Sequence, residues 1–193
     1  MTILTPNTAI LSIHLVNDIV GEGTAFGSLF YPQVVERDVI ARSNEAFAAV
    51  REAGGLVVHV CIALAPDYSD SDPNIPLLAM AEQAGALQAG SEGASLLDDV
   101  NVNSSDATLT HNRPGPFTGS ELENLLRERG ITDVIVSGVA TNASVDSTVR
   151  QASDLGFKTY LLEDACSAAT PEAHAAAVET AGLFARIITT ADL

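Results

Sequence analysis

The stretch TDVIVSGVATNASVDST, residues 132–148, decides the fold of this chain. Its first six residues are mostly β-branched or apolar, as expected for a buried parallel strand, and Gly138 ends this run before a helix-compatible segment. Such a strand-to-helix elbow points backbone N–H groups outward at the helix N-terminus, where they bind anions or stabilise an oxyanion. The hydroxyl of Ser144 lies in the first helical turn, so the elbow predicts a nucleophile or, equally, a helix cap.

Apolar, strand-like runs alternate with helix-like patterns along the rest of the chain. We expect strands at 9–13, 56–62, 107–110, 133–137, 158–162 and 186–188. We expect helices at 34–53, 119–129, 142–155 and 171–184, with stop signals at Gly54, Gly130 and Gly156. This alternation predicts an α/β fold, a three-layer, doubly wound, mostly parallel sheet of the Rossmann-like kind. Residues 65–106, rich in Pro, Asp, Ser and Gly, are expected to be a long irregular insertion that forms a lid or an interface.

Composition and charge limit the classes of function. A chain of 193 residues with 47% apolar content is expected to be one domain over residues 1–193. Its net charge of −16 argues against nucleic acid or an anionic membrane as a partner. We find no signal-peptide pattern and no apolar run of about 18 residues, and so expect a cytoplasmic protein. Cys61 and Cys166 lack metal-type spacing and lie beside expected strands, which predicts buried, reduced thiols.

The ends of the expected strands are where a doubly wound sheet holds its ligands. Three strand ends supply candidate residues, namely Asp18, His111 and Ser144. Judged by residue type alone, Asp18 is as readily a helix cap or a solvated loop residue. By the same measure, His111 is a loop histidine packed against Phe117.

Three motifs in this order carry a resemblance to a known family. They are AILSIHLVND at 9–18, HNRPGPFTGS at 111–120 and GVATN at 138–142. With these motifs the chain resembles the isochorismatase-like hydrolase superfamily, also called the cysteine hydrolase family, over nearly its whole length. The resemblance implies the isochorismatase-type version of the fold and hydrolysis of a small molecule.

The resemblance also implies roles for individual residues. Asp18 would be the general base, His111 would stand where most members have lysine, and Ser144 would stand where the family has its nucleophilic cysteine. A cis peptide bond between Val139 and Ala140 would turn the amides of Ala140 and Ser144 toward the substrate carbonyl as an oxyanion hole. Apart from the resemblance, the aromatic side chain of Phe117 near a strand end is a candidate for the wall of the substrate pocket, with ordinary core packing as the alternative.

The serine changes what the site needs, because a hydroxyl is far less acidic than a thiol with its pKa of about 8.5. Asp18 could accept the serine proton, and His111 could assist as a base or, if protonated, supply the positive charge of the usual lysine. We favour the electrostatic or orienting role for His111. His14 either supports the site or is a core histidine, and Arg113 either holds a substrate carboxylate or forms an ordinary ion pair.

We expect neither a metal nor another cofactor. Nicotinamidase-like members of the family carry an Asp-x-His metal motif after the second strand, but here residues 61–67 read CIALAPD. A glycine-rich phosphate loop is also missing from the sequence. The resemblance implies a small-molecule substrate and a homodimer or homotetramer.

Three functions remain open at this point. The first and favoured one is hydrolysis of a small amide, imide or ureido C–N bond, with Ser144 as nucleophile or in place of a cysteine. The second is cleavage of a vinyl ether without a nucleophile, with Asp18 as the proton donor. The third is a noncatalytic homologue that binds a small molecule.

Overall fold

In the computed structural model, which describes residues 3–193, six strands form one parallel sheet in the order β3-β2-β1-β4-β5-β6. The strands are β1 (Thr8–Ile13), β2 (Leu56–Ile62), β3 (Ala107–His111), β4 (Asp133–Val139), β5 (Lys158–Ser167) and β6 (Arg186–Ile188). From β1 the chain winds outward to β2 and β3, returns to β4 beside β1, and winds outward again to β5 and β6. The doubly wound parallel sheet is therefore confirmed. Its topological switch point lies between β1 and β4.

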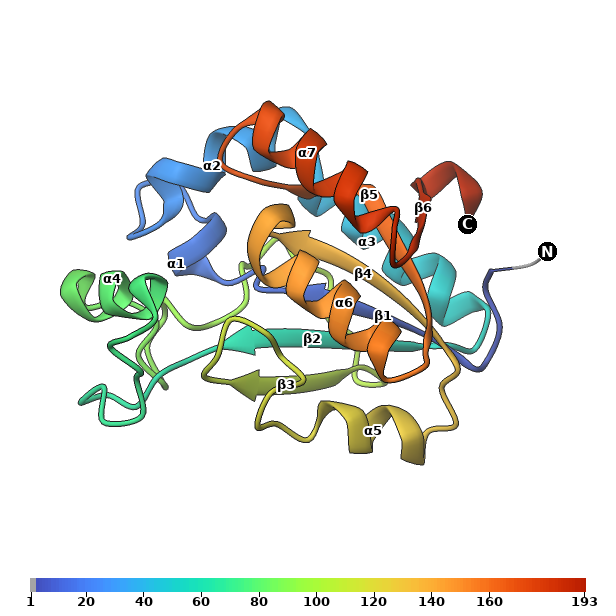
Figure 1. The fold of residues 1–193 in the computed structure, drawn as a ribbon, viewed down its shortest axis with the longest axis horizontal. Coiled ribbons are helices and arrows are strands. Elements are labelled where there is room, and N and C mark those ends of the chain that lie inside the picture. The colour runs from blue at the N-terminus through green and yellow to red at the C-terminus, as the bar shows by residue number, and fades with distance from the viewer. Residues whose placement is uncertain (1–2) are drawn as a thin grey trace.

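Helices cover both faces of this sheet, with α6 in front of it and α3 behind it in the view of Figure 1. The α-helices are α1 (Asn17–Val20), α2 (Gly27–Glu36), α3 (Val39–Glu52), α4 (Pro76–Ala84), α5 (Leu122–Glu128), α6 (Asp146–Asp154) and α7 (Pro171–Ala181). Apolar residues of α2 and α3 pack on one face of the sheet, and those of α5 and α6 pack on the other. Because both faces are covered, β1 and β2 are buried along their whole length. No helix within residues 3–193 is both long and apolar enough to cross a membrane.

Two expectations about the helices are wrong. The single helix expected over residues 34–53 is two helices, α2 and α3, which are separated at Asp38 by a left-handed backbone with φ 54°. The insertion at 65–106 is not irregular throughout, since it contains α4. This helix begins at a proline and ends at Gly85 in the left-handed conformation, both of which suit a short helix. It lies beyond the carboxyl ends of β2 and β3 (Figure 1).

Gly138 brings β4 unusually close to β1. It does not end its strand as expected but lies inside β4, at an irregularity in the pairing with β5. Its φ of 110° is outside the range that residues with a side chain prefer, and a Cβ built there would lie 2.1 Å from the carbonyl oxygen of Ile13. The glycine therefore allows the two strands at the switch point to approach each other where both end.

We expect Gly138→Ala to lower the free energy of unfolding by about 3 kcal/mol or more, because the methyl group meets backbone as well as an unfavourable φ. In a domain of this size that corresponds to a fall in Tm of roughly 6–12 °C in a thermal melt. Gly156→Ala is the matched control, since Gly156 has a φ of 82° but no atom within 4 Å of its Cβ position. The control substitution should lower the free energy of unfolding by about 1 kcal/mol. Equal losses in the two variants would contradict the close approach of β4 to β1.

Candidate active site

A small cavity of about 50 Å³ lies beyond the carboxyl ends of β1 and β4, where a doubly wound sheet is expected to bind its ligand. The residues that line it come from the ends of β1, β2 and β4, from α1, α2 and α4, and from the loop after α4. They are His14, Ile19, Phe26, Phe30, Ile62, Leu77, Leu78, Leu87, Val139, Ala140, Ala143 and Ser144. The insertion therefore supplies part of the wall. Within residues 3–193 there is no group of three or more His, Cys, Asp or Glu side chains placed to hold a metal ion.

Two buried histidines meet at the edge of this cavity. His14 is the first residue after β1, with a left-handed backbone of φ 55°, and His111 is the last residue of β3. Their Nε2 atoms are 2.8 Å apart and their rings stack with centroids separated by 5.0 Å. One Nε2 must donate its hydrogen and the other accept it, so each imidazole fixes the tautomer of its partner. On its other side, His111 borders a more open hollow that Asp70 and Asn112 also line.

Burial keeps this histidine pair uncharged near neutral pH. It lowers the pKa of His14 well below the usual value, and the neighbouring His111 lowers it further. Burial also lowers the pKa of His111 to about 4, although a hydrogen bond with the backbone of Arg113 opposes this shift. The positive charge expected for His111 is therefore corrected to a neutral imidazole. A neutral pair can accept a proton, which a charged pair could not do.

Ser144 lies on the elbow after β4, as the sequence predicts. The elbow is a π-helical turn, Thr141–Val145, that leads into α6, and the hydroxyl-bearing residue is only 3% exposed. The peptide bond between Val139 and Ala140 is cis, as the resemblance implied. Both residues line the cavity with Ser144. The N–H of Ala140 donates to no atom of residues 3–193, so it remains available to a ligand.

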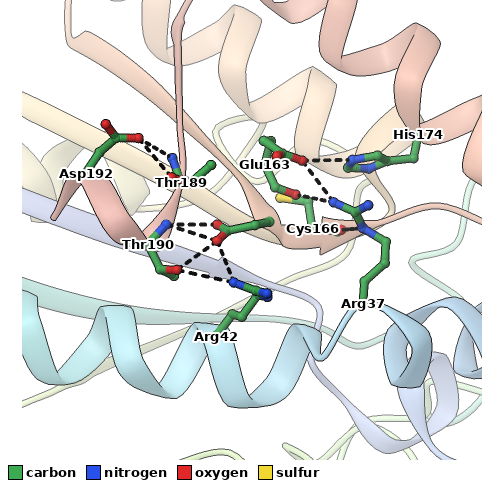
Figure 2. A network of polar contacts seen from close by, with 9 residues as sticks. Arg37, Arg42, Glu163, Cys166, His174, Thr189, Thr190 and Asp192 are labelled. Carbon is green, nitrogen blue, oxygen red and sulfur yellow. Dashed lines mark hydrogen bonds and ion pairs between the residues drawn. The ribbon is translucent and has the colours of Figure 1, made fainter.

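A polar network contacts the first residue of the elbow, and Figure 2 shows the part of it around Glu163. Thr141 shares a hydrogen bond of 2.8 Å with Nδ1 of His174 on α7, and Nε2 of that histidine lies 3.4 Å from Glu163. Arg37 donates to the same carboxylate at 2.9 Å and to the carbonyl oxygen of Cys166 at 2.8 Å. Figure 2 shows His174 and Arg37 converging on Glu163 from α7 and from the end of α2. The network ties the first residue of the elbow to β5 and to two helices, and the sequence analysis did not find it.

The structure places Asp18 differently from Ser144 and His14. Asp18 lies in α1, and its Oδ2 accepts a hydrogen bond of 2.7 Å from the N–H of Leu87. A Cβ built on Gly93 would lie 2.1 Å from that oxygen, so the carboxylate packs directly against the glycine backbone. Asp18 is not among the residues that line the cavity. The hydrogen bond of Asp18 links α1 to the insertion, whereas His14, four residues earlier, lies on the cavity wall.

Phe117 and Arg113 lie outside the cavity wall as well. Phe117 packs against Phe157, with ring centroids 6.3 Å apart, beside the core formed by α5 and α6. Arg113 donates to the carbonyl oxygens of Asp70 and Asn112 at 3.1 and 3.2 Å. Of the six site residues taken from the sequence, the structure thus brings Ser144, Val139 and Ala140 to one cavity, with His111 reaching it through His14.

The two cysteines are free and buried, as expected. Burial raises the pKa of Cys61 to about 11 and also raises that of Cys166. A thiol with so high a pKa is a poor nucleophile near neutral pH. Neither cysteine lines the cavity, so among residues 3–193 Ser144 is the one hydroxyl or thiol side chain on its wall.

Comparisons with known proteins agree on one family. The profile of the Isochorismatase domain matches residues 8–192. The uncharacterized isochorismatase family protein YecD of Escherichia coli O157:H7 is 32% identical over 142 residues, 71% of each chain. The ureidoacrylate amidohydrolase RutB of Klebsiella pneumoniae (strain 342) is 28% identical over 95% of this chain and 81% of its own. The solved structure of an isochorismatase family protein from Burkholderia thailandensis superposes with a TM-score of 0.83 at 28% identity, covering 100% of this chain and 96% of the other.

Proposed function

Because this chain belongs to the isochorismatase family of hydrolases, we propose that it cleaves a small carboxylic amide by acyl transfer to Ser144, with the His14–His111 pair as general base. One observation carries this proposal: His14 and Ser144 line the same cavity, while His14 is hydrogen-bonded to a second buried, neutral imidazole. Cleavage of a C–N bond is supported by similarity to RutB, which is named as a ureidoacrylate amidohydrolase.

In the first half of the proposed reaction, Ser144 Oγ attacks the carbonyl carbon and gives its proton to His14. In this reaction the Nε2–H of His14 donates to Nε2 of His111, which leaves Nδ1 of His14 without a hydrogen and able to accept that proton. The Ala140 N–H is positioned on the cavity wall to donate to the oxygen that becomes negatively charged. When the C–N bond breaks, the proton on His14 passes to the departing amine, which leaves neutral.

In the second half, water attacks the acyl group on Ser144 and His14 accepts a proton from that water. The proton then returns to Ser144 Oγ as the acyl–oxygen bond breaks and the carboxylic acid leaves. Throughout, His111 acts as a positioning residue, because its hydrogen bond orients the ring of His14.

Acid-catalysed cleavage of a vinyl ether is supported less well. That reaction needs a proton donor beside the substrate, and no residue on the cavity wall is a carboxylic acid. The Asp18 carboxylate is engaged with Leu87, and burial lowers the pKa of both imidazoles. The noncatalytic alternative predicts no turnover at all, which the following experiment decides.

The pH dependence of turnover tests the proposal. The base acts in its neutral form, and burial holds its pKa well below 6.5, so the pair stays competent as the pH falls through the usual histidine range. We therefore expect kcat/KM for release of 4-nitrophenol from 4-nitrophenyl butyrate to stay flat from about pH 8 to about pH 5.5. A loss with a midpoint at about pH 6.5 would contradict a buried neutral base. Absence of turnover with this ester and with a panel of small amides would overturn acyl transfer itself.

A further inference from the structure

The wall of the Ser144 cavity is almost entirely apolar. Ten of its twelve lining residues are Ile, Phe, Leu, Val or Ala, and the other two are His14 and Ser144. Phe26 is buried, and Phe30 is partly buried against the same core. A ligand in this cavity therefore meets hydrocarbon everywhere except at the reacting group.

No cationic side chain reaches the wall, although the chain has nine lysines and arginines. Arg113, the nearest of them in the sequence to the His111 strand end, is committed to the carbonyl oxygens of Asp70 and Asn112. Arg37, which lies behind the elbow, is committed to Glu163. An ionised carboxylate on a bound substrate would thus lose its hydration without gaining a cationic partner.

The histidines do not change this conclusion. A buried carboxylate could form an ion pair with His14 only if His14 took up a proton from solvent, and a protonated His14 can no longer accept the proton of Ser144. Binding of an anion and catalysis would therefore oppose each other in this cavity. A neutral apolar group suffers neither penalty and gains from burial against the aromatic and aliphatic wall.

We infer that the substrate delivers an uncharged acyl group with a compact hydrocarbon chain, and that the cavity rejects acyl groups that carry a carboxylate. This inference rests on the proposed acyl transfer to Ser144, and it adds which acyl groups the cavity accepts. It sets this chain apart from its relative RutB, because ureidoacrylate, the substrate in that protein's name, is itself a carboxylate.

Two esters with the same leaving group test the inference. 4-Nitrophenyl butyrate and the 4-nitrophenyl monoester of succinic acid have acyl chains of equal length, and the second ends in a carboxylate. We expect kcat/KM to favour the butyrate by at least about 10²-fold. The ratio should persist in about 0.5 M NaCl, where repulsion by the net charge of the protein is screened but burial of the carboxylate is not.

Two arginine variants on α4 test whether the preference for butyrate arises in the cavity. Leu77 lines the cavity, whereas Met80 lies on the same helix, is 47% exposed and does not line it. Leu77→Arg should reduce the preference for butyrate at least about tenfold, and Met80→Arg should leave the ratio as in the unmodified chain.

Equal turnover of both esters by the unmodified chain, or a preference for the succinate, would overturn this inference while leaving acyl transfer to Ser144 intact. Loss of the ratio in salt, or the same shift in both variants, would also overturn it. Turnover of neither ester would instead count against the proposed function.

Discussion

His14→Asn should lower kcat/KM for 4-nitrophenyl butyrate by about 10³-fold, whereas Asp18→Asn should change it by less than about threefold. The two residues are four positions apart, yet only His14 lines the cavity with Ser144. Asparagine tolerates the left-handed backbone at this position and can still form a hydrogen bond with His111, but it cannot accept a proton. The variant therefore removes the base and retains much of the local structure.

Asp18→Asn provides the opposite result in the same assay. An asparagine oxygen still accepts the N–H of Leu87, but a hydrogen bond to a charged carboxylate is replaced by a neutral one. We expect this variant to lose about 1 kcal/mol of stability while turnover persists. The opposite pattern, with Asp18→Asn inactive and His14→Asn active, would return the role of base to Asp18.

Most of the fold could be predicted from the sequence because its signals are local. Short runs of apolar and β-branched residues predict the strands, and the glycines at 54, 130 and 156, all with positive φ, end the elements that precede them. The break between α2 and α3 could not be predicted, because apolar residues lie on both sides of it and Asp38 is not a residue type that requires φ above zero. The end of β5 was missed because the strand continues through the charged Glu163 and Asp164.

The site residues also fall into two groups, those that local sequence could place and those whose placement depends on distant contacts. Ser144, Val139 and Ala140 could be placed because one continuous elbow positions them. From the sequence we expect Asp18 to be the base; that His14 and not Asp18 lines the cavity could not be predicted, because the position of Asp18 depends on Leu87 and Gly93, which lie far along the chain. The charge state of His111 was missed for the same reason, since it depends on burial and on a contact with His14 across the sheet.

The second large effect should come from Ser144 itself. Ser144→Ala removes the proposed nucleophile and should lower turnover of 4-nitrophenyl butyrate by about 10³-fold or more. Ser144→Cys should stay active on this ester, because a neutral imidazole deprotonates a thiol more readily than a hydroxyl. Thermal melts of the two variants should resemble that of the unmodified chain, since Ser144 Oγ makes no hydrogen bond within residues 3–193. Full turnover by Ser144→Ala would rule out a covalent step at this residue.

The most direct test of acyl transfer is to look for the acyl group on the protein. The chain is mixed with excess 4-nitrophenyl butyrate, quenched in acid within the first turnover, and measured by intact-mass and peptide mass spectrometry. The account expects the mass of one butyryl group on the peptide that contains Ser144, and none on that peptide in Ser144→Ala. A butyryl group on another residue, retained by Ser144→Ala together with its turnover, would contradict it.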